Sequence, residues 1–309
     1  MKRSLLDSFQ QLEGIDKCGV LFSGGVDSSL AAVLSDRFCD EICLLTSHAE
    51  GSRDSQIVFK SAKKLNMHLI ETQMDSENVW STLPELIHAI QRYNRMDVEI
   101  ALPIFLSSKE AKKIGIMDIV SGQGPDELFA GYARHVEVLK NEGGEALQRL
   151  LCEEISKTHD VNIDRDEKAI TYNNVAAYFP YLDSEFIKIA LSIPESWKID
   201  LGKTPSRKVI FRKLAIEMGL PIELAMKPKD ATQYSSGSSK IIIESIRNHI
   251  LNSKSISRRR ASAIVQDVFE TIAFHVGVTD KLPINLELKI DMEATKKFHE
   301  KKKSIIPQQ

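Results

Sequence analysis

The chain has 309 residues and a net charge of -2, with 42% hydrophobic and 27% charged residues. This length allows one large domain with a smaller appendage, and the composition is that of an ordinary globular protein. The charge argues against nucleic acid or an anionic membrane as a partner, the apolar runs are too short to span a bilayer, and the first residues lack a signal-peptide core, so we expect a cytoplasmic location.

The first half of the chain alternates short apolar runs with helical patterns. We expect strands at 18–22, 41–47, 68–72 and 117–120, and helices at 28–36, 52–66, about 80–93 and 103–113. This order predicts an α/β fold with a parallel sheet and helices on both of its faces. The four cysteines match no zinc or redox spacing, and we expect them to be reduced and buried.

The second half reads as mostly helical, with helices expected at 145–157, 165–178, 184–192 and 206–218. Residues 227–240 are polar and rich in serine, which predicts a flexible loop. Residues 261–272 keep helical spacing and should pack on another element. The lysine-rich stretch at 296–303 is expected to be a frayed, solvated tail.

A glycine-containing loop follows the first strand and leads into a helix. It reads Ser-Gly-Gly-Val-Asp-Ser-Ser from Ser23 to Ser29. Such a segment can be an ordinary helix cap, but the order strand, loop, helix favours a phosphate cradle made of backbone N–H groups and hydroxyls. The predicted cradle residues are Ser23, Gly24, Gly25, Asp27, Ser28 and Ser29. Asp27 would repel a phosphate unless a divalent cation lies between them, so we expect Mg²⁺. The loop is neither a Walker A motif nor a dinucleotide fingerprint.

A second loop follows the strand at 117–120 and reads Ser-Gly-Gln-Gly-Pro-Asp-Glu-Leu-Phe-Ala-Gly-Tyr from Ser121 to Tyr132. By themselves, Asp126 and Glu127 could be only the acidic first turn of a helix. Because the carboxyl ends of parallel strands share one sheet edge, however, Asp27 and Asp126 can hold one Mg²⁺ between them.

The first loop resembles the PP-loop of the N-type ATP pyrophosphatases, which cleave ATP between the α and β phosphates. The second resembles the Ser-Gly-Glu-Gly-Ser-Asp-Glu-Leu-Phe-Gly-Gly-Tyr signature of the synthetase domain of asparagine synthetases. The chain keeps nine of these twelve positions and differs at Gln123, Pro125 and Ala130. The resemblance implies ATP and Mg²⁺ as ligands, with Ser121 and Gly122 at the nucleotide.

Further segments follow the order of the same family. The stretch at 45–52 resembles the adenine-binding loop, which implies nucleotide contacts by Leu45 and Thr46. The segments 179–183 and 208–212 resemble the family's Pro-Phe-Leu-Asp and Lys-x-Leu-Leu-Arg motifs. Lys229 falls at the position where the family has the lysine that neutralises phosphate charge in the transition state. Lys229 and Glu127 are therefore the expected catalytic residues, with Glu127 on the acceptor or nucleophile side.

The resemblance implies a synthetase-like ATP pyrophosphatase domain at 1–250 and a helical extension with a basic tail at 251–309. Because the PP-loop begins within the first thirty residues, we expect no N-terminal glutaminase domain. Nitrogen would come from ammonia, from a separate glutaminase subunit, or from an amine on the substrate. The sequence leaves open whether the protein forms a homodimer.

The acceptor side departs from the family pattern. Asparagine synthetases usually carry Glu-Ala-Arg ahead of Pro-Phe-Leu-Asp, where this chain has Ala176, Ala177 and Tyr178. A shifted alignment could give the role of the family's glutamate to Glu185 or Tyr172. The implied reaction is AMP-forming amidation of a carboxylate such as aspartate. The alternatives are a ligase with another acceptor or amine, as in β-lactam synthetases, a tRNA-modifying PP-loop enzyme, and an ATP-binding protein without turnover.

Overall fold

The computed structural model describes residues 1–227, 236–249, 257–283 and 293–305. Its strands are β1 (Lys17–Leu21), β2 (Glu41–Ala49), β3 (His68–Met74), β4 (Asp118–Val120) and β5 (Ala176–Tyr178). The helices up to β5 are α1 (Lys2–Phe9), α2 (Val26–Ser35), α3 (Arg53–Leu65), α4 (Ser76–Ile90), α5 (Arg95–Lys113), α6 (Pro125–Leu128), α7 (Ala133–Glu142), α8 (Gly144–Thr158) and α9 (Asp164–Thr171). The later helices are α10 (Ser184–Ser192), α11 (Glu195–Lys198), α12 (Val209–Glu217), α13 (Ile222–Ala225), α15 (Ser238–His249), α16 (Arg258–Ala263), α17 (Val265–His275) and α18 (Glu293–Ile305). Three short turns complete the description: two 3₁₀ turns, η1 (Gln10–Leu12) and η3 (Pro180–Leu182), and the π-helical turn η2 (His159–Ile163).

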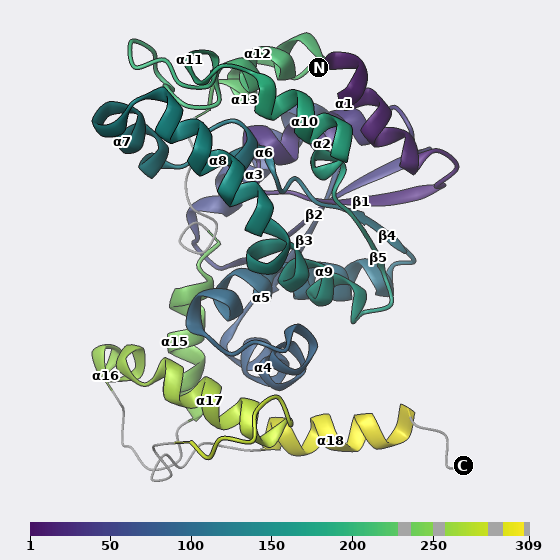
Figure 1. Ribbon diagram of the computed structural model, residues 1–309. Coiled ribbons are helices and arrows are strands. Elements are labelled where there is room, and N and C mark those ends of the chain that lie inside the picture. The colour runs from purple at the N-terminus through teal and green to yellow at the C-terminus, as the bar shows by residue number, and fades with distance from the viewer. Residues whose placement is uncertain (228–235, 250–256, 284–292, 306–309) are drawn as a thin grey trace. The chain divides into compact units, whose positions relative to one another are not determined.

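The five strands form one sheet in the order β3-β2-β1-β4-β5. β1 pairs in parallel with both β2 and β4, and β4 pairs in parallel with β5. Helices α1, α2 and α10 lie on one side of this sheet and α9 on the other (Figure 1). The α/β fold with a parallel sheet is therefore confirmed, and the loops after β1 and β4 leave neighbouring strands at the same edge.

The hydrophobic core lies between the sheet and the helices around α2. Alternate residues of β1, Cys18 and Val20, point into this core together with Ile42 and Leu44 of β2. Helix α2 follows β1 directly and buries nearly all of its apolar residues in the same core. The register of β1 and the start of α2 are thereby fixed by apolar burial, which positions the loop between them.

The structure corrects the sequence interpretation at several elements. Residues 176–178 form the edge strand β5, whereas a helix was expected to continue through 178; α9 ends near the left-handed Asn174, with φ +56°. Pro103 lies inside α5 and does not begin that helix. Helix α12 begins at Val209, three residues later than expected, because Lys208 adopts φ +57°. The lysine-rich stretch belongs to helix α18 and is not a frayed tail.

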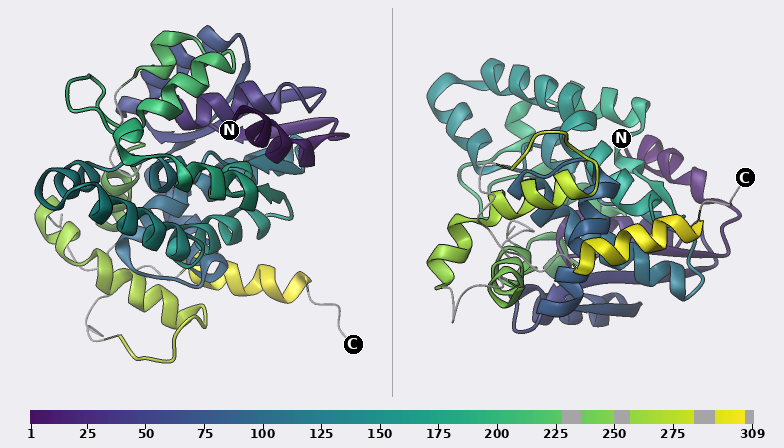
Figure 2. Two further views of the ribbon diagram at one scale, coloured as in Figure 1. Left: turned by 45° about the horizontal axis from the view of Figure 1, so that its top comes forward. Right: turned by 90° about the horizontal axis from the view of Figure 1, so that it is seen from below.

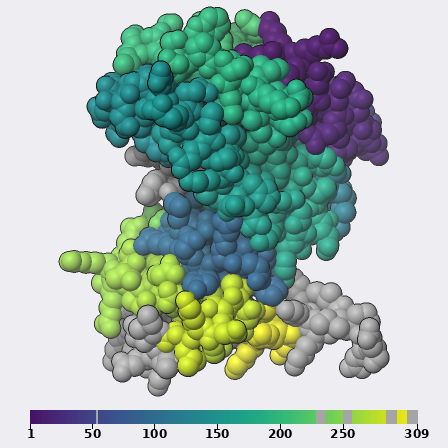
Figure 3. Space-filling view, in the orientation of Figure 1, coloured from purple at the N-terminus to yellow at the C-terminus, as the bar shows by residue number. Residues whose placement is uncertain are grey.

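The chain divides into two compact units. The first comprises Met1–Thr46, Gln56–Ile70 and Ser108–Asp230, and the second comprises Ser47–Ser55, Glu71–Ser107 and Ala231–Gln309. In the second unit, α15, α17 and α18 pack on α4, as the blue, green and yellow segments show (Figures 2 and 3). The expected packing of the 261–272 segment is confirmed by the buried Val265, Val268 and Phe269. The expected boundary at residue 250 stays a prediction.

Two further expectations concern membranes and cysteines. None of the helices in the described part of the chain is long and apolar enough to span a bilayer. All four cysteines are free; Cys18, Cys39 and Cys43 are buried as expected, whereas Cys152 is exposed.

Lys198 is a buried lysine in the first unit. It is fully buried at the end of α11, which packs on α8 and α12, and its ammonium has no hydrogen-bond partner among the described residues. Burial lowers the pKa of Lys198 to about 8, against the weaker opposing effects of Cys152 and Glu195. The folded protein therefore holds this ammonium at a cost in stability at neutral pH.

We expect Lys198→Met to stabilise the protein at pH 7 by up to about 3 kcal/mol. Between the folded pKa near 8 and the ordinary lysine value of about 10.5, the unfolded chain binds more protons than the folded one. The free energy of unfolding of the wild type therefore rises as the pH rises through that window. The difference in this free energy between the wild type and Lys198→Met should disappear at the upper end of the window. Urea unfolding at pH 7 and pH 10.5 measures this, with the exposed Lys213→Met as control. A constant difference at both pH values would contradict the prediction.

Candidate functional site

The loop between β1 and α2 forms a concave backbone segment. Gly24 adopts φ +68°, and a Cβ there would lie 2.9 Å from Ser61 Oγ, so any other residue would be strained at this position. Gly25 caps α2 without a side-chain hydrogen bond. The N–H groups of the first turn of α2 are thus not taken by a capping side chain, as anion binding at a helix N-terminus requires.

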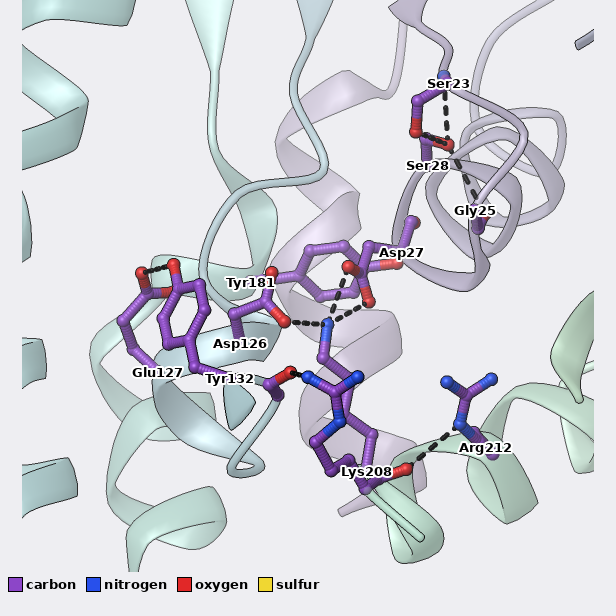
Figure 4. Close-up of polar contacts among 12 residues, drawn as sticks. Ser23, Gly25, Asp27, Ser28, Asp126, Glu127, Tyr132, Tyr181, Lys208 and Arg212 are labelled. Atoms are coloured by element: carbon purple, nitrogen blue, oxygen red, sulfur yellow. Dashed lines mark hydrogen bonds and ion pairs between the residues drawn. The ribbon is translucent and has the colours of Figure 1, made fainter. Parts of the chain in front are cut away.

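The serines of this loop form hydrogen bonds within it. Ser28 Oγ accepts from the backbone N–H of Ser23, lies 3.2 Å from Ser23 Oγ, and donates to the carbonyl of Gly25 (Figure 4). Ser29 is fully buried, and its hydroxyl has no hydrogen-bond partner among the described residues. Ser28 therefore holds the loop closed, while Ser23 is the serine nearer the solvent.

The loop after β4 lies directly against the first loop. A Cβ on Gly122 would come within 3.1 Å of the backbone nitrogen of Ser28, so a side chain there would crowd the backbone of the first loop. Ser121 is buried and donates its N–H to the carbonyl of Tyr178, which continues the pairing of β4 with β5. The buried phenol of Tyr181 donates to the carbonyl of Asp27 over 3.0 Å. The two loops are held together at one sheet edge.

Asp27 and Asp126 converge on the ammonium of Lys208. Lys208 Nζ lies 2.8 Å and 2.7 Å from the two carboxylate oxygens of Asp27 and 2.7 Å from Asp126 Oδ1 (Figure 4). The Lys208 side chain is only 2% exposed. Burial would lower the pKa of Lys208, but the carboxylates of Asp126 and Asp27 outweigh it, and the pKa is raised. The lysine is held as a cation.

Glu127 lies next to this triad and is buried. Its Oε1 accepts from the Tyr132 hydroxyl at 2.6 Å and from Asn162 Nδ2 at 3.2 Å. Asn162 belongs to η2, and π-helical turns are frequent at functional sites. Burial, followed by the charge of Asp126, raises the pKa of Glu127, although the hydrogen bond from Tyr132 opposes the shift. Glu127 is therefore more readily protonated than an ordinary glutamate.

A second buried cluster involves Gln123. Its Nε2 donates to Asp166 Oδ2 at 2.7 Å, and the other oxygen of Asp166 pairs with Arg165. Asp166 and Arg165 are both buried. A glutamate at position 123, as in the asparagine synthetase signature, would face the Asp166 carboxylate at hydrogen-bonding distance, so the glutamine suits this ion pair.

Arg212 fixes the chain at residues 225–227, which lies beside the first loop. Arg212 Nη1 donates to the carbonyls of Ala225 and Lys227. Lys227 Nζ in turn donates to the carbonyl of Gly24 and to Ser61 Oγ, both at 3.1 Å. A further positive charge thus lies beside the loop at 23–29.

Most predicted site residues lie in the first unit near one sheet edge. Leu45 accepts from the N–H of Phe22 through its carbonyl at 2.8 Å, and Thr46 is buried beside it at the end of the β2 segment in this unit. Asp27, Asp126 and Glu127 are brought together with the glycine loops. Lys229 lies outside the described residues, and its catalytic role stays a prediction. The sequence interpretation did not predict the contacts of Lys208 with the two aspartates or those of Tyr132 and Asn162 with Glu127. For Lys208 there was one usable signal, because two carboxylates that face each other need a cation between them.

The carboxylates of Asp27 and Asp126 also fit a divalent cation. Both present oxygens to one point, and oxygen is the ligand that Mg²⁺ prefers. The described residues contain no group of three or more acidic, histidine or cysteine side chains that could hold a metal. A magnesium ion at this pair would therefore complete its coordination with phosphate oxygens and water, as is common for Mg²⁺.

Comparison with known proteins agrees with this geometry. The family model described as Asparagine synthase matches residues 1–144 and 139–273. The chain belongs to the asparagine synthase family. The predicted resemblance to this family is thereby confirmed.

Several relatives share about half of their length with this family member. A protein of Methanocaldococcus jannaschii, provisionally named asparagine synthetase 1 (glutamine-hydrolysing), is 32% identical over 286 residues, or 83% of this chain and 52% of that protein. Asparagine synthetase of Sandersonia aurantiaca is 28% identical over 75% of this chain and 46% of its own. The chain spans about half the length of these curated relatives. The solved NMN synthetase of Francisella tularensis aligns with 92% of this chain and 97% of its own, with a TM-score of 0.40 and 10% identity.

We expect Gly131→Ala to disrupt the carboxylate–lysine triad. A Cβ at Gly131 would overlap Asp126 Oδ1 and the Cε of Lys208, neither of which can move without breaking the ion pairs. The free energy of unfolding should fall by about 1–3 kcal/mol. Urea unfolding measures this, with Gly202→Ala as control because a Cβ there meets Asp200 only at ordinary contact distance. Equal stability of both variants would refute the tight packing at Gly131.

Proposed function

We propose that this asparagine synthase family member is an AMP-forming amide ligase that activates a carboxylate with ATP and then amidates it. The observation that carries the proposal is the convergence of Asp27 and Asp126 beside the loop at 23–29. A site that only binds nucleotide does not need two carboxylates facing the phosphates. A site that separates pyrophosphate from AMP needs two such carboxylates, because they would hold a divalent cation that neutralises charge on the phosphates.

In this proposal, the α2 loop binds the β and γ phosphates. The first-turn N–H groups of α2 and the hydroxyl of Ser23 donate to phosphate oxygens, and Lys227 adds positive charge beside the loop. Leu45 and Thr46 contact the nucleoside from the end of β2, and Ser121 with Gly122 closes the site from the neighbouring loop. Asp27 and Asp126 would hold Mg²⁺, which supplies charge neutralisation at the phosphates when bound.

The proposed reaction has two balanced steps. A carboxylate oxygen of the substrate attacks the α-phosphorus of ATP, the bond to the bridging oxygen breaks, and pyrophosphate leaves with the electron pair. A nitrogen nucleophile then attacks the acyl carbon of the acyl-adenylate, AMP leaves, and the nitrogen loses a proton to solvent or to a nearby base. Lys229 is proposed to offset the charge that develops on the phosphates.

The acceptor is proposed to be aspartate or a similar carboxylate, and the altered β5 segment favours one that differs from aspartate. Ala176 is exposed and offers no polar side chain, and the Tyr178 hydroxyl already donates to Asp118 Oδ1 at 3.0 Å. Glu127, held by Tyr132 and Asn162, is proposed to serve the acceptor or nucleophile side. The nitrogen is proposed to come from ammonia, a separate glutaminase subunit or a substrate amine.

The activity test is incubation with Mg-ATP, ammonium chloride and a panel of carboxylates. We expect AMP and pyrophosphate in equal amounts with at least one acceptor, and hydroxylamine in place of ammonium should give the corresponding hydroxamate. Formation of ADP and phosphate, or no turnover with any acceptor, would refute an AMP-forming ligase.

Asp27→Asn is expected to reduce pyrophosphate release by on the order of 100-fold or more, because it removes a proposed metal ligand beside the phosphates. The circular dichroism spectrum should stay that of the folded wild type. Asp36→Asn, an exposed change just after the same helix, should keep full activity. Undiminished pyrophosphate release by Asp27→Asn would exclude the metal role.

A further inference from the structure

Lys208 occupies the place between the two carboxylates that a bound cation would take. Its ammonium contacts three carboxylate oxygens at 2.7–2.8 Å. Magnesium binds oxygen ligands at about 2.0–2.1 Å, so an ion on the same oxygens would lie close to this ammonium. Two positive charges so close together in a largely buried site repel strongly. The ammonium and the ion cannot both stay on the pair.

The position of Lys208 is built into the fold. Its backbone lies in the left-handed region at φ +57°, which is unfavourable for a residue with a Cβ and is often retained at functional sites. Gly131 leaves room for the end of the side chain, and Arg207 Nη1 donates to the carbonyl of Gly131 at 2.7 Å. The strained backbone of Lys208 and the absence of a Cβ at Gly131 together place one ammonium between two carboxylates.

We propose that the Lys208 ammonium is a tethered counter-ion that competes with the divalent cation for the Asp27–Asp126 pair. Without metal, Lys208 neutralises the carboxylates and holds the two loops together. When a divalent cation binds, the ammonium withdraws from the carboxylates. Lys208 therefore weakens the binding of free metal.

The withdrawn ammonium needs a new anion, because an unpaired buried charge is costly. The phosphates of a nucleotide at the neighbouring loop would provide it; this step rests on the function proposed above. Metal and nucleotide would then promote each other's binding, since each relieves a cost imposed on the other. Lys208 would thereby make metal binding tighter in the nucleotide-bound protein than in the free protein.

The test is a titration of the wild type and of Lys208→Gln with Mn²⁺ in the absence of nucleotide, followed by electron paramagnetic resonance. Removal of the competing charge should lower the Kd for Mn²⁺ by at least about ten-fold. Lys208→Met should act in the same direction. Lys213→Gln removes a charge from an exposed position of the same helix and should leave the Kd unchanged. Unchanged or weaker Mn²⁺ binding by Lys208→Gln would overturn the proposal.

A second measurement uses the wild type alone, in case the variants are unstable. In protein labelled with ¹⁵N-lysine, the buried ammonium of Lys208 should give a protected cross-peak that Mg²⁺ at saturating concentration shifts or removes. A protected ammonium signal that Mg²⁺ leaves unchanged would equally overturn the proposal. Neither experiment contains nucleotide, so a failed ligase assay with intact competition would refute only the proposed function.

Discussion

Two carboxylates that face each other in a largely buried site require a cation between them. In this chain the carboxylates of Asp27 and Asp126 come from loops that follow two neighbouring strands, β1 and β4, and the cation is Lys208 at the start of α12. The pairing of the strands brings the loops to one edge, and the ion pairs connect them to a helix far away in the sequence. The rest of the first unit keeps these three groups in place.

The surrounding contacts position the members of the triad. Tyr181 fixes the backbone of Asp27, and the absence of side chains at Gly122 and Gly131 lets the loops approach each other and the lysine. The side chain of Asp183, in the same segment as Tyr181, accepts from the N–H groups of Glu185 and Phe186 and so begins α10. The motif at 179–183 thus supports the loop that contains Asp27 and begins a helix, in both cases through well-defined hydrogen bonds.

The sequence could predict the elements whose signal is local. The strand, loop and helix around Ser23–Ser29 were predictable from an apolar run, two glycines and a helical pattern, and the convergence of Asp27 with Asp126 followed from parallel strand topology. β5 could not be found because Ala176–Tyr178 has three residues, one of them exposed, and no apolar alternation. The Lys208 contact joins residues 181 positions apart, which no local pattern encodes.

The two halves of the site differ in how they are built. The two loops that follow β1 and β4 depend on backbone geometry, which glycines and strand pairing fix regardless of most side chains. The surroundings of Glu127 and Gln123 depend on side-chain networks, because Glu127 is held by Tyr132 and Asn162, and Gln123 by Asp166. A change in one member of such a network alters the shape and charge presented to a substrate without disturbing the loops. The glutamine at 123 therefore sets the charge of its own network with Asp166, and the backbone geometry of the two loops does not depend on it.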